Sequence, residues 1–312
     1  MAATETMDPH VEAHGHEGGA DWSGGKEPFR ISYGKLMMWY FLVSDAFTFA
    51  GFLIAYGALR FSSPTWPVPD FVFSTAPFGI HGAPLIFVTI MSFLLIISSV
   101  TMVRGVQEGH RENKSGALFW VLMTAIGGLG FLGCQAWEWT NLIKTEHMTV
   151  TRNPFGTHTH DGVYLDDKGK PSEETFRAGT SYLIHKHDPA HAEGGHEAGH
   201  ASYEPGDHPG YMMDDKGFVH RKFQYTDGAD AGKVQMEEFG PKAFGALFFF
   251  ITGFHGFHVF TGVLILLIVA VNIASGLYIE RRNGYEMVEK IGLYWHFVDL
   301  VWVFVFLVFY LL

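Results

Sequence analysis

Charged residues are scarce in this sequence of 312 residues, at 17%, against about 25% in an ordinary soluble domain. The single cysteine, Cys134, excludes an internal disulfide and a cluster of thiolate metal ligands within the chain. Lys and Arg number 21 against 32 Asp and Glu, and no basic stripe is present, which argues against nucleic acid as a partner. The sequence also lacks a glycine-rich phosphate loop, a nucleophile elbow and a cysteine pair for a dinuclear copper centre. It therefore predicts no redox cofactor and no metal site in this chain.

Apolar residues are abundant instead, at 48% hydrophobic and 16% aromatic. Five apolar runs are each long enough to cross a hydrocarbon core, which takes roughly 20 helical residues. Only helices suit such runs, because an isolated strand leaves its backbone amides unpaired in lipid. The predicted fold class is therefore all-α and integral to a membrane, with five transmembrane helices in a bundle. The runs lie at about 36–58, 84–104, 117–139, 242–274 and 291–312.

Polar segments divide the chain into four parts. Residues 1–35 form a polar tail without the apolar core of a signal peptide, so we expect an uncleaved N-terminus. Helices within 36–139 and 242–312 flank a polar, acidic, His-rich loop at 140–241. Basic residues concentrate in the tail and in the second and fourth connections, and the positive-inside rule then predicts a cytoplasmic N-terminus, with the loop and the C-terminus periplasmic.

The loop at 140–241 has no membrane-length apolar run, and no internal repeat is apparent in the chain. Its middle, 190–210, has low complexity, while Arg177–His187 and Gly217–Asp227 mix aromatic and β-branched residues and predict short strands. Histidines recur irregularly among glycines, unlike the four fixed ligands of a structural zinc site, so we interpret them as a solvated tract that binds metal weakly. They are His185, His187, His191, His196 and His200 in the loop, and His10, His14 and His16 in the tail.

Seven polar residues in or near the apolar runs are the candidate functional positions, because an ionisable group at membrane depth costs at least about 2.5 to 3.5 kcal/mol unless it is partnered. Most occur in pairs three residues apart, so each pair shares a helix face. Hydrogen bonding between helices or to a neighbouring subunit is the simplest role for them. For Asp45, a single acid in an apolar helix, a functional and a structural role are both open. The seven are Asp45, Gln135, Glu138, His255, His258, His296 and Asp299.

Two of these pairs lie in distinctive motifs. The runs TGFHGFH at Thr252–His258 and YWHFVDLVW at Tyr294–Trp302 resemble the two signature stretches of subunit III of haem-copper terminal oxidases, the cytochrome c oxidase subunit III family. The resemblance extends to SDAFTF at 44–49, SSVTMVRGVQEG at 98–109 and GCQAWEW at 133–139. It covers all five predicted helices and fails over the tail and the long loop.

This resemblance implies a multi-pass subunit of a bacterial inner (plasma) membrane that holds no haem or copper of its own. Those cofactors would reside in the partner subunits I and II. The family implies bound phospholipid in a V-shaped cleft, and support of proton uptake, stability and assembly in an aa-type cytochrome c oxidase. The complex would reduce O2 and translocate protons in aerobic respiration. The chain is similar to the shorter type of member, which has five helices where longer relatives have seven.

Single positions carry further implications of the resemblance. Asp45 matches the family's buried carboxylate, which is usually Glu and is sensitive to carbodiimide in mitochondrial-type members. The lipid-headgroup arginine of the family has no clear match, and the candidates are Arg104, Arg281 and Arg282.

Three alternatives concern the function. An Asp at position 45 is similar to the quinol-oxidising branch, so the chain is alternatively subunit III of a quinol oxidase or of a nitric-oxide-reductase-associated homologue. The long loop, which is short in familiar members, predicts a docking surface for cytochrome c or another respiratory complex. A proton-coupled transporter with Asp45 and Asp299 as a relay would predict inverted repeats and broken helices, and the sequence shows neither.

Overall fold

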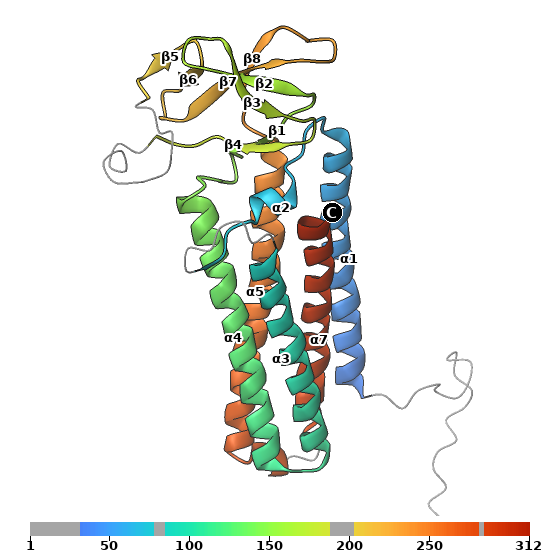
Figure 1. Ribbon diagram of the computed structural model, residues 1–312. Coiled ribbons are helices and arrows are strands. Elements are labelled where there is room, and N and C mark those ends of the chain that lie inside the picture. The colour runs from blue at the N-terminus through green and yellow to red at the C-terminus, as the bar shows by residue number, and fades with distance from the viewer. Residues whose placement is uncertain (1–31, 78–84, 188–202, 281–283) are drawn as a thin grey trace, which may run out of the picture.

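The computed structural model describes residues 32–77, 85–187, 203–280 and 284–312, which form a helical bundle with β-strands at one end (Figure 1). Within these residues five helices are long and apolar enough to cross a membrane, which confirms the prediction. They are α1 (Tyr33–Ser62), α3 (Ile86–His110), α4 (Lys114–Lys144), α5 (Lys242–Ala274) and α7 (Glu286–Phe306), which continues as a π-helical turn over Leu307–Leu311. Two short helices, α2 (Pro69–Val72) and α6 (Leu277–Glu280), lie in the connections.

Several helices run past the ends of their apolar runs. The last turns of α1, α3 and α4 contain Arg60, His110 and Lys144, side chains that interact favourably with the negative end of a helix dipole. A prediction from hydropathy alone places the ends of these three helices too early, because their last turns are polar and lie outside the apolar stretch.

The helices are packed closely enough that small residues are required at their contacts. A Cβ atom on Gly128 of α4 would lie 2.5 Å from the Trp295 ring of α7, so a glycine here lets two backbones approach. The helix α1 makes its main helix contacts with α5 and α7, at the edge of the bundle. Its outer surface exposes large apolar side chains such as Phe47, at 75% exposure, which suits a lipid or protein neighbour in the membrane.

The polar loop forms eight strands in its described part, which we call the β layer, at the end of the bundle that carries the C-terminus (Figure 1). All pairings are antiparallel: one sheet has the order β3-β2-β7-β6-β5 with β8 paired to β7, and β1 pairs with β4 separately. The two predicted strand regions contain β4 and β7, while most other strands are too short to show a pattern. The strands are β1 (Phe155–Thr157), β2 (Gly162–Leu165), β3 (Pro171–Phe176), β4 (Ser181–Leu183), β5 (Gly206–Asp207), β6 (Tyr211–Met213), β7 (Val219–Tyr225) and β8 (Val234–Met236).

Two hairpins of the β layer share a ten-residue pattern, HxGxxxDDKG, at 160–169 and 208–217. The expectation that the chain has no internal repeat is therefore wrong for this short pattern. In each turn the first Asp accepts two backbone amides through Oδ1: Asp166 from Lys168 and Lys170, and Asp214 from Lys216 and Phe218, all at 2.8 or 2.9 Å. The closing glycines have φ values of +73° and +80°, a left-handed conformation that favours glycine.

Both ends of the β layer meet at one point on the bundle. The Gly240 amide donates to the Asn153 carbonyl at 3.0 Å, so the chain leaves and re-enters the bundle at neighbouring residues. Phe155 of β1 belongs to the buried core of the bundle. The Thr157 hydroxyl donates to the Trp66 carbonyl at 2.9 Å, which ties the layer to the connection after α1.

A buried hydrogen-bond chain crosses the core of the β layer. The Tyr164 hydroxyl donates to Glu237 Oε1 at 2.9 Å and lies 2.9 Å from His158 Nε2. The Arg221 guanidinium lies over the Tyr164 ring at 3.9 Å and donates twice to Glu174. Burial raises the pKa of Glu237 to about 7 and lowers the pKa of His158 to about 4. The uncharged form of each group is therefore favoured by its surroundings.

These two groups give the β layer opposing pH dependences. The pKa of Glu237 rises from 4.5 to about 7, so its stabilisation is complete below pH 4.5 and is lost as the pH rises through 7. The pKa of His158 falls from 6.5 to about 4, so its stabilisation is complete above pH 6.5 and is lost as the pH falls through 4. Between pH 4.5 and 6.5 the two slopes cancel, and the layer's free energy of unfolding should stay nearly constant.

Glu237→Gln should leave only the slope of His158, because glutamine does not titrate. The free energy of unfolding of the β layer should then rise by about 1.4 kcal/mol per pH unit between the two pKa values of His158. Urea-dependent pulse proteolysis of the full chain in detergent, with cleavage mapped within 155–236, measures this. The exposed neighbour Glu238 provides the control Glu238→Gln, and equal slopes in both variants would contradict the assignment.

Candidate functional site

Asp45 of α1 faces His258 of α5, with 3.1 Å between Asp45 Oδ2 and His258 Nε2. Asp45 lies ten residues after Lys35, or about 15 Å along the helix, which places the contact deep in the apolar bundle. His258 Nδ1 donates to the Phe254 carbonyl at 2.8 Å, so Nε2 is the nitrogen that shares a proton with Asp45. A single proton between these groups makes an ion pair or a neutral hydrogen-bonded pair, and either form avoids an isolated buried charge.

Three side-chain hydrogen bonds join α3 to α7, and each uses a serine of α3. Ser98 and Ser99 begin the run at 98–109 that resembles the family, but the sequence did not indicate their role, because a hydroxyl in an apolar helix ordinarily bonds a carbonyl of its own helix. Ser92 and Ser98 do this as well, at 2.9 and 2.7 Å. The bonds across the interface run from Trp302 to Ser92, from Trp295 to Ser98 and between His296 Nδ1 and Ser99, at 2.9, 3.0 and 2.6 Å.

Asp299 lies one helical turn beyond His296 on α7 and is 8% exposed. Neither of its carboxyl oxygens has a hydrogen-bond partner among the described residues. The Ser99 hydroxyl is the side-chain group that interacts with it. Asp299 thus differs from Asp45, whose carboxyl contacts an imidazole.

The remaining predicted residues join α4 and α5 to α7. Glu138 Oε2 accepts a hydrogen bond from the Tyr310 hydroxyl at 3.0 Å, and His255 Nε2 donates to the Val298 carbonyl at 3.1 Å. The side-chain amide of Gln135 has no partner among the residues described. Tyr310, in the π-helical turn, had no sequence signal because an aromatic near a helix end is common in membrane proteins.

The predicted polar residues therefore lie at several separate helix contacts and do not converge on one reaction centre. Among the described residues, no three His, Cys, Asp or Glu side chains are placed to hold a metal ion. Of the predicted His-rich tract, His185 and His187 lie in the described part of the β layer. His191, His196, His200 and the histidines of the tail lie outside the described residues.

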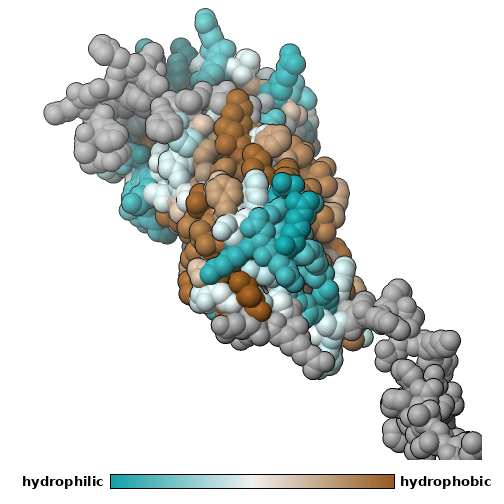
Figure 2. Space-filling view, turned by 90° about the horizontal axis from the view of Figure 1, so that it is seen from below, coloured by the Kyte–Doolittle hydropathy of each residue, from teal (hydrophilic) through white to brown (hydrophobic). Residues whose placement is uncertain are grey.

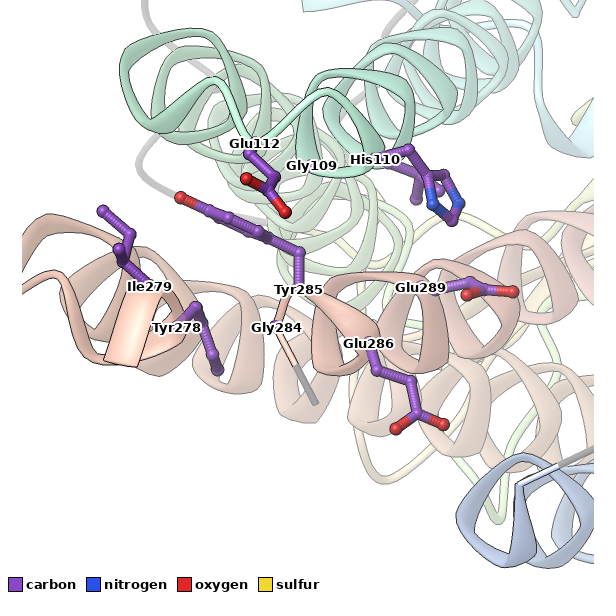
Figure 3. Close-up of a pocket in the computed structure, with 10 residues that line it drawn as sticks. Gly109, His110, Glu112, Tyr278, Ile279, Gly284, Tyr285, Glu286 and Glu289 are labelled. Atoms are coloured by element: carbon purple, nitrogen blue, oxygen red, sulfur yellow. The ribbon is translucent and has the colours of Figure 1, made fainter. Parts of the chain in front are cut away.

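At the end of the bundle opposite the β layer, a cavity of 450 Å³ lies between the end of α3 and the start of α7. Figure 3 shows the Glu112 carboxyl close to the Tyr285 ring, with Glu286 and Glu289 on the first turns of α7. Seen from this end, hydrophilic residues form a central patch beside hydrophobic helix flanks (Figure 2).

A groove of 530 Å³ adjoins this cavity and is shared between α3 and α7. We call it the α3–α7 groove. It extends from this end of the bundle to His296. Its lining residues are Val103, Val106, Gln107, His110, Arg111, Glu289, Gly292, Leu293 and His296.

Among the arginines predicted to contact lipid headgroups, Arg104 lies on α3. It donates to Gln107 Oε1 at 2.9 Å and approaches the Trp120 ring at 5.7 Å. Arg281 and Arg282 lie outside the described residues. The role of all three in lipid binding stays a prediction.

Comparison with known proteins gives one consistent result. The family model described as Cytochrome c oxidase subunit III matches residues 235–312, the segment that holds α5, α7 and both histidine motifs. Cytochrome c oxidase subunit 3 of Synechocystis is 24% identical over 96% of this chain and 80% of its own length.

Shorter matches have higher identity. The probable cytochrome c oxidase subunit 3 of Rickettsia prowazekii is 34% identical over 30% of this chain and 29% of the relative. Cytochrome c oxidase subunit 3 of Glycine max is 46% identical over 22% of this chain and 24% of the relative. The chain thus spans less than a third of the length of these two relatives.

The long match reaches across nearly the whole chain, and the short ones are drawn from the same family. The structure adds five membrane-length helices within the described residues. The matched segment is the one whose histidines contact α1, α3 and α7. On these grounds the chain is similar to the cytochrome c oxidase subunit III family along nearly its whole length.

Proposed function

We propose that this chain is subunit III of an aa-type cytochrome c oxidase in a bacterial inner membrane. It would support proton uptake, stability and assembly of a complex that reduces O2 and pumps protons. The contact between Asp45 and His258 supports this most directly, because it uses the position of the family's buried carboxylate. Two motifs that are more than 200 residues apart in sequence meet there to join α1 to the bundle.

The polar side chains of the bundle connect helices to one another. We therefore assign the reduction of O2 to the partner subunits. Subunits I and II would carry haem and copper, and this chain would bind them and phospholipid through its apolar outer surfaces. The outward side of α1 offers such a surface, with Ile54 at 71% and Phe61 at 91% exposure. We further propose a V-shaped lipid cleft beside α1, a cytoplasmic N-terminus and a periplasmic C-terminus.

The β layer is proposed as the docking surface for cytochrome c or a neighbouring respiratory complex. Acidic residues outnumber basic ones in 140–241, which attracts a basic partner over about 10 Å at moderate salt. With α1 beginning at the opposite end of the bundle (Figure 1), a cytoplasmic N-terminus would place this layer in the periplasm.

Affinity purification of the tagged chain in mild detergent should bring down chromophore-bearing partners. We expect haem A absorbance that travels with the chain and a dinuclear copper signal from subunit II. Haem absorbance without the copper signal would favour a quinol oxidase or a nitric-oxide-reductase-associated complex. A monodisperse chain without any coloured companion would contradict the proposal.

Asp45→Ala should shorten the active lifetime of the complex during turnover more than it lowers the initial rate. The reason is that His258 loses its partner and α1 loses its polar link to α5. His258→Ala and the double variant should have nearly the same effect, because all three remove one interaction. Ser44→Ala is the control, since the Ser44 hydroxyl bonds only the Phe41 carbonyl of its own helix in the described structure. A double variant whose loss equals the sum of the single losses would argue against a shared interaction.

Replacing residues 156–237 by a short glycine linker should leave the bundle intact, because Asn153 and Gly240 are already in contact. The complex should keep its turnover with an artificial donor but lose apparent affinity for cytochrome c, measured by steady-state kinetics, or lose its association with a larger assembly, measured by native gel. Unchanged affinity together with unchanged assembly size would exclude the docking role.

A further inference from the structure

The α3–α7 groove is large enough to hold water and has polar side chains along a mainly apolar lining. Its volume of 530 Å³ is far above the roughly 30 Å³ that one water occupies in the liquid. Five of its nine lining residues carry polar or titratable side chains: Gln107, His110, Arg111, Glu289 and His296. Lys35 pairs with Glu289 at 2.8 Å, so charged groups lie at the outer end. A groove lined only by aliphatic side chains would instead be filled by lipid.

Both walls of the groove lead inward to the same three polar groups. On α7 the lining residues 289, 292, 293 and 296 follow helical spacing, and Asp299 is the next residue on that face. On α3 the residues 110, 107, 106 and 103 follow the same spacing toward the membrane interior, and Ser99 continues it. At this point Ser99 Oγ and His296 Nδ1 are 2.6 Å apart.

The inner end of this path is the buried carboxyl of Asp299, which interacts with the Ser99 hydroxyl. Asp299 is 8% exposed, and neither of its oxygens accepts a hydrogen bond within the described structure. The other three acids buried within the long helices have side-chain partners: Glu138 accepts from Tyr310, Glu108 accepts from Arg111 and Asn113, and Asp45 contacts His258. An isolated carboxylate at such a depth is costly, and a bound proton removes that charge.

We propose that Asp299 is a proton-binding site at the inner end of the α3–α7 groove, reached from water in the groove through His296 and Ser99. His296 Nε2 has no hydrogen-bond partner in the described part of the chain and takes a proton from groove water. His296 Nδ1 passes its proton to Ser99 Oγ, and the Ser99 hydroxyl proton moves to the Asp299 carboxylate. One proton leaves the groove and one arrives at Asp299. Ser99 and His296 keep their starting charges, His296 changes from the Nδ1–H to the Nε2–H tautomer, and no electrons move.

This inference stands apart from the proposed function, because a proton can bind to Asp299 whatever partners surround the chain. A carboxyl loaded from one end of the bundle would act as a local proton store beside any protein packed against α3 and α7. Its tests measure the protonation and the water accessibility of this chain alone, and they need neither haem nor O2 turnover. A failed co-purification and a failed proton site are therefore distinguishable.

Infrared difference spectroscopy of the full chain in lipid tests the site directly. A carbonyl band of a protonated carboxylic acid should disappear in Asp299→Asn, and in the wild type it should shift promptly on transfer to D2O. Ser99→Ala should slow that shift about tenfold, because the link between His296 and Asp299 is lost. Ser98→Ala is the matched control, since its hydroxyl bonds Trp295 instead. The absence of a band assigned to Asp299, or equal exchange in Ser99→Ala and Ser98→Ala, would overturn the proposal.

A second measurement tests for water in the groove. In a background with Cys134→Ala, Leu293→Cys should react with a charged, membrane-impermeant thiol reagent added from the side of the groove opening. Leu300→Cys, on the same helix and 56% exposed outside the groove lining, should not react. If Leu293→Cys reacts only with an apolar maleimide, lipid fills the groove and the proton route is wrong.

Discussion

The contact between Asp45 and His258 is the interaction on which the position of α1 depends. Between helices in lipid the hydrophobic effect offers little net attraction, so close packing and polar contacts decide which helices associate. The helix α1 lies at the edge of the bundle and meets mainly α5 and α7. Its acid pairs with an imidazole whose other nitrogen is fixed by the Phe254 carbonyl. The hydrogen bond within α5 thus orients the group that holds α1.

The interface between α3 and α7 is held by another kind of contact. There the links are neutral donors on tryptophan and histidine that meet serine hydroxyls, while Gly292 lets Val106 of α3 approach closely. Within this well-satisfied interface, Asp299 is left without a hydrogen bond. Among the buried acids of the bundle, Asp45, Glu108 and Glu138 each contact a donor side chain, whereas neither oxygen of Asp299 accepts a hydrogen bond within the described residues.

The helices were predictable because a span of about 20 apolar residues has few other solutions. The pairing of the polar residues was not, since hydropathy places Asp45 and His258 at depth without saying which helices face each other. The serines that complete the interface have no periodic signature of their own. In the β layer, strands of two to four residues are below the length at which alternation shows, whereas the repeated DDKG turns were present in the sequence at identical spacing and mark both hairpins.

Those repeated turns also bear on the order of assembly. Each hairpin closes between residues that are neighbours in sequence, such as β2 with β3 and β6 with β7, and contacts of this kind form quickly. The whole layer is synthesised before α5. The layer can therefore fold outside the membrane while α5 is still emerging from the ribosome. The hydrogen bond from the Gly240 amide to the Asn153 carbonyl then fixes where α5 begins relative to the end of α4.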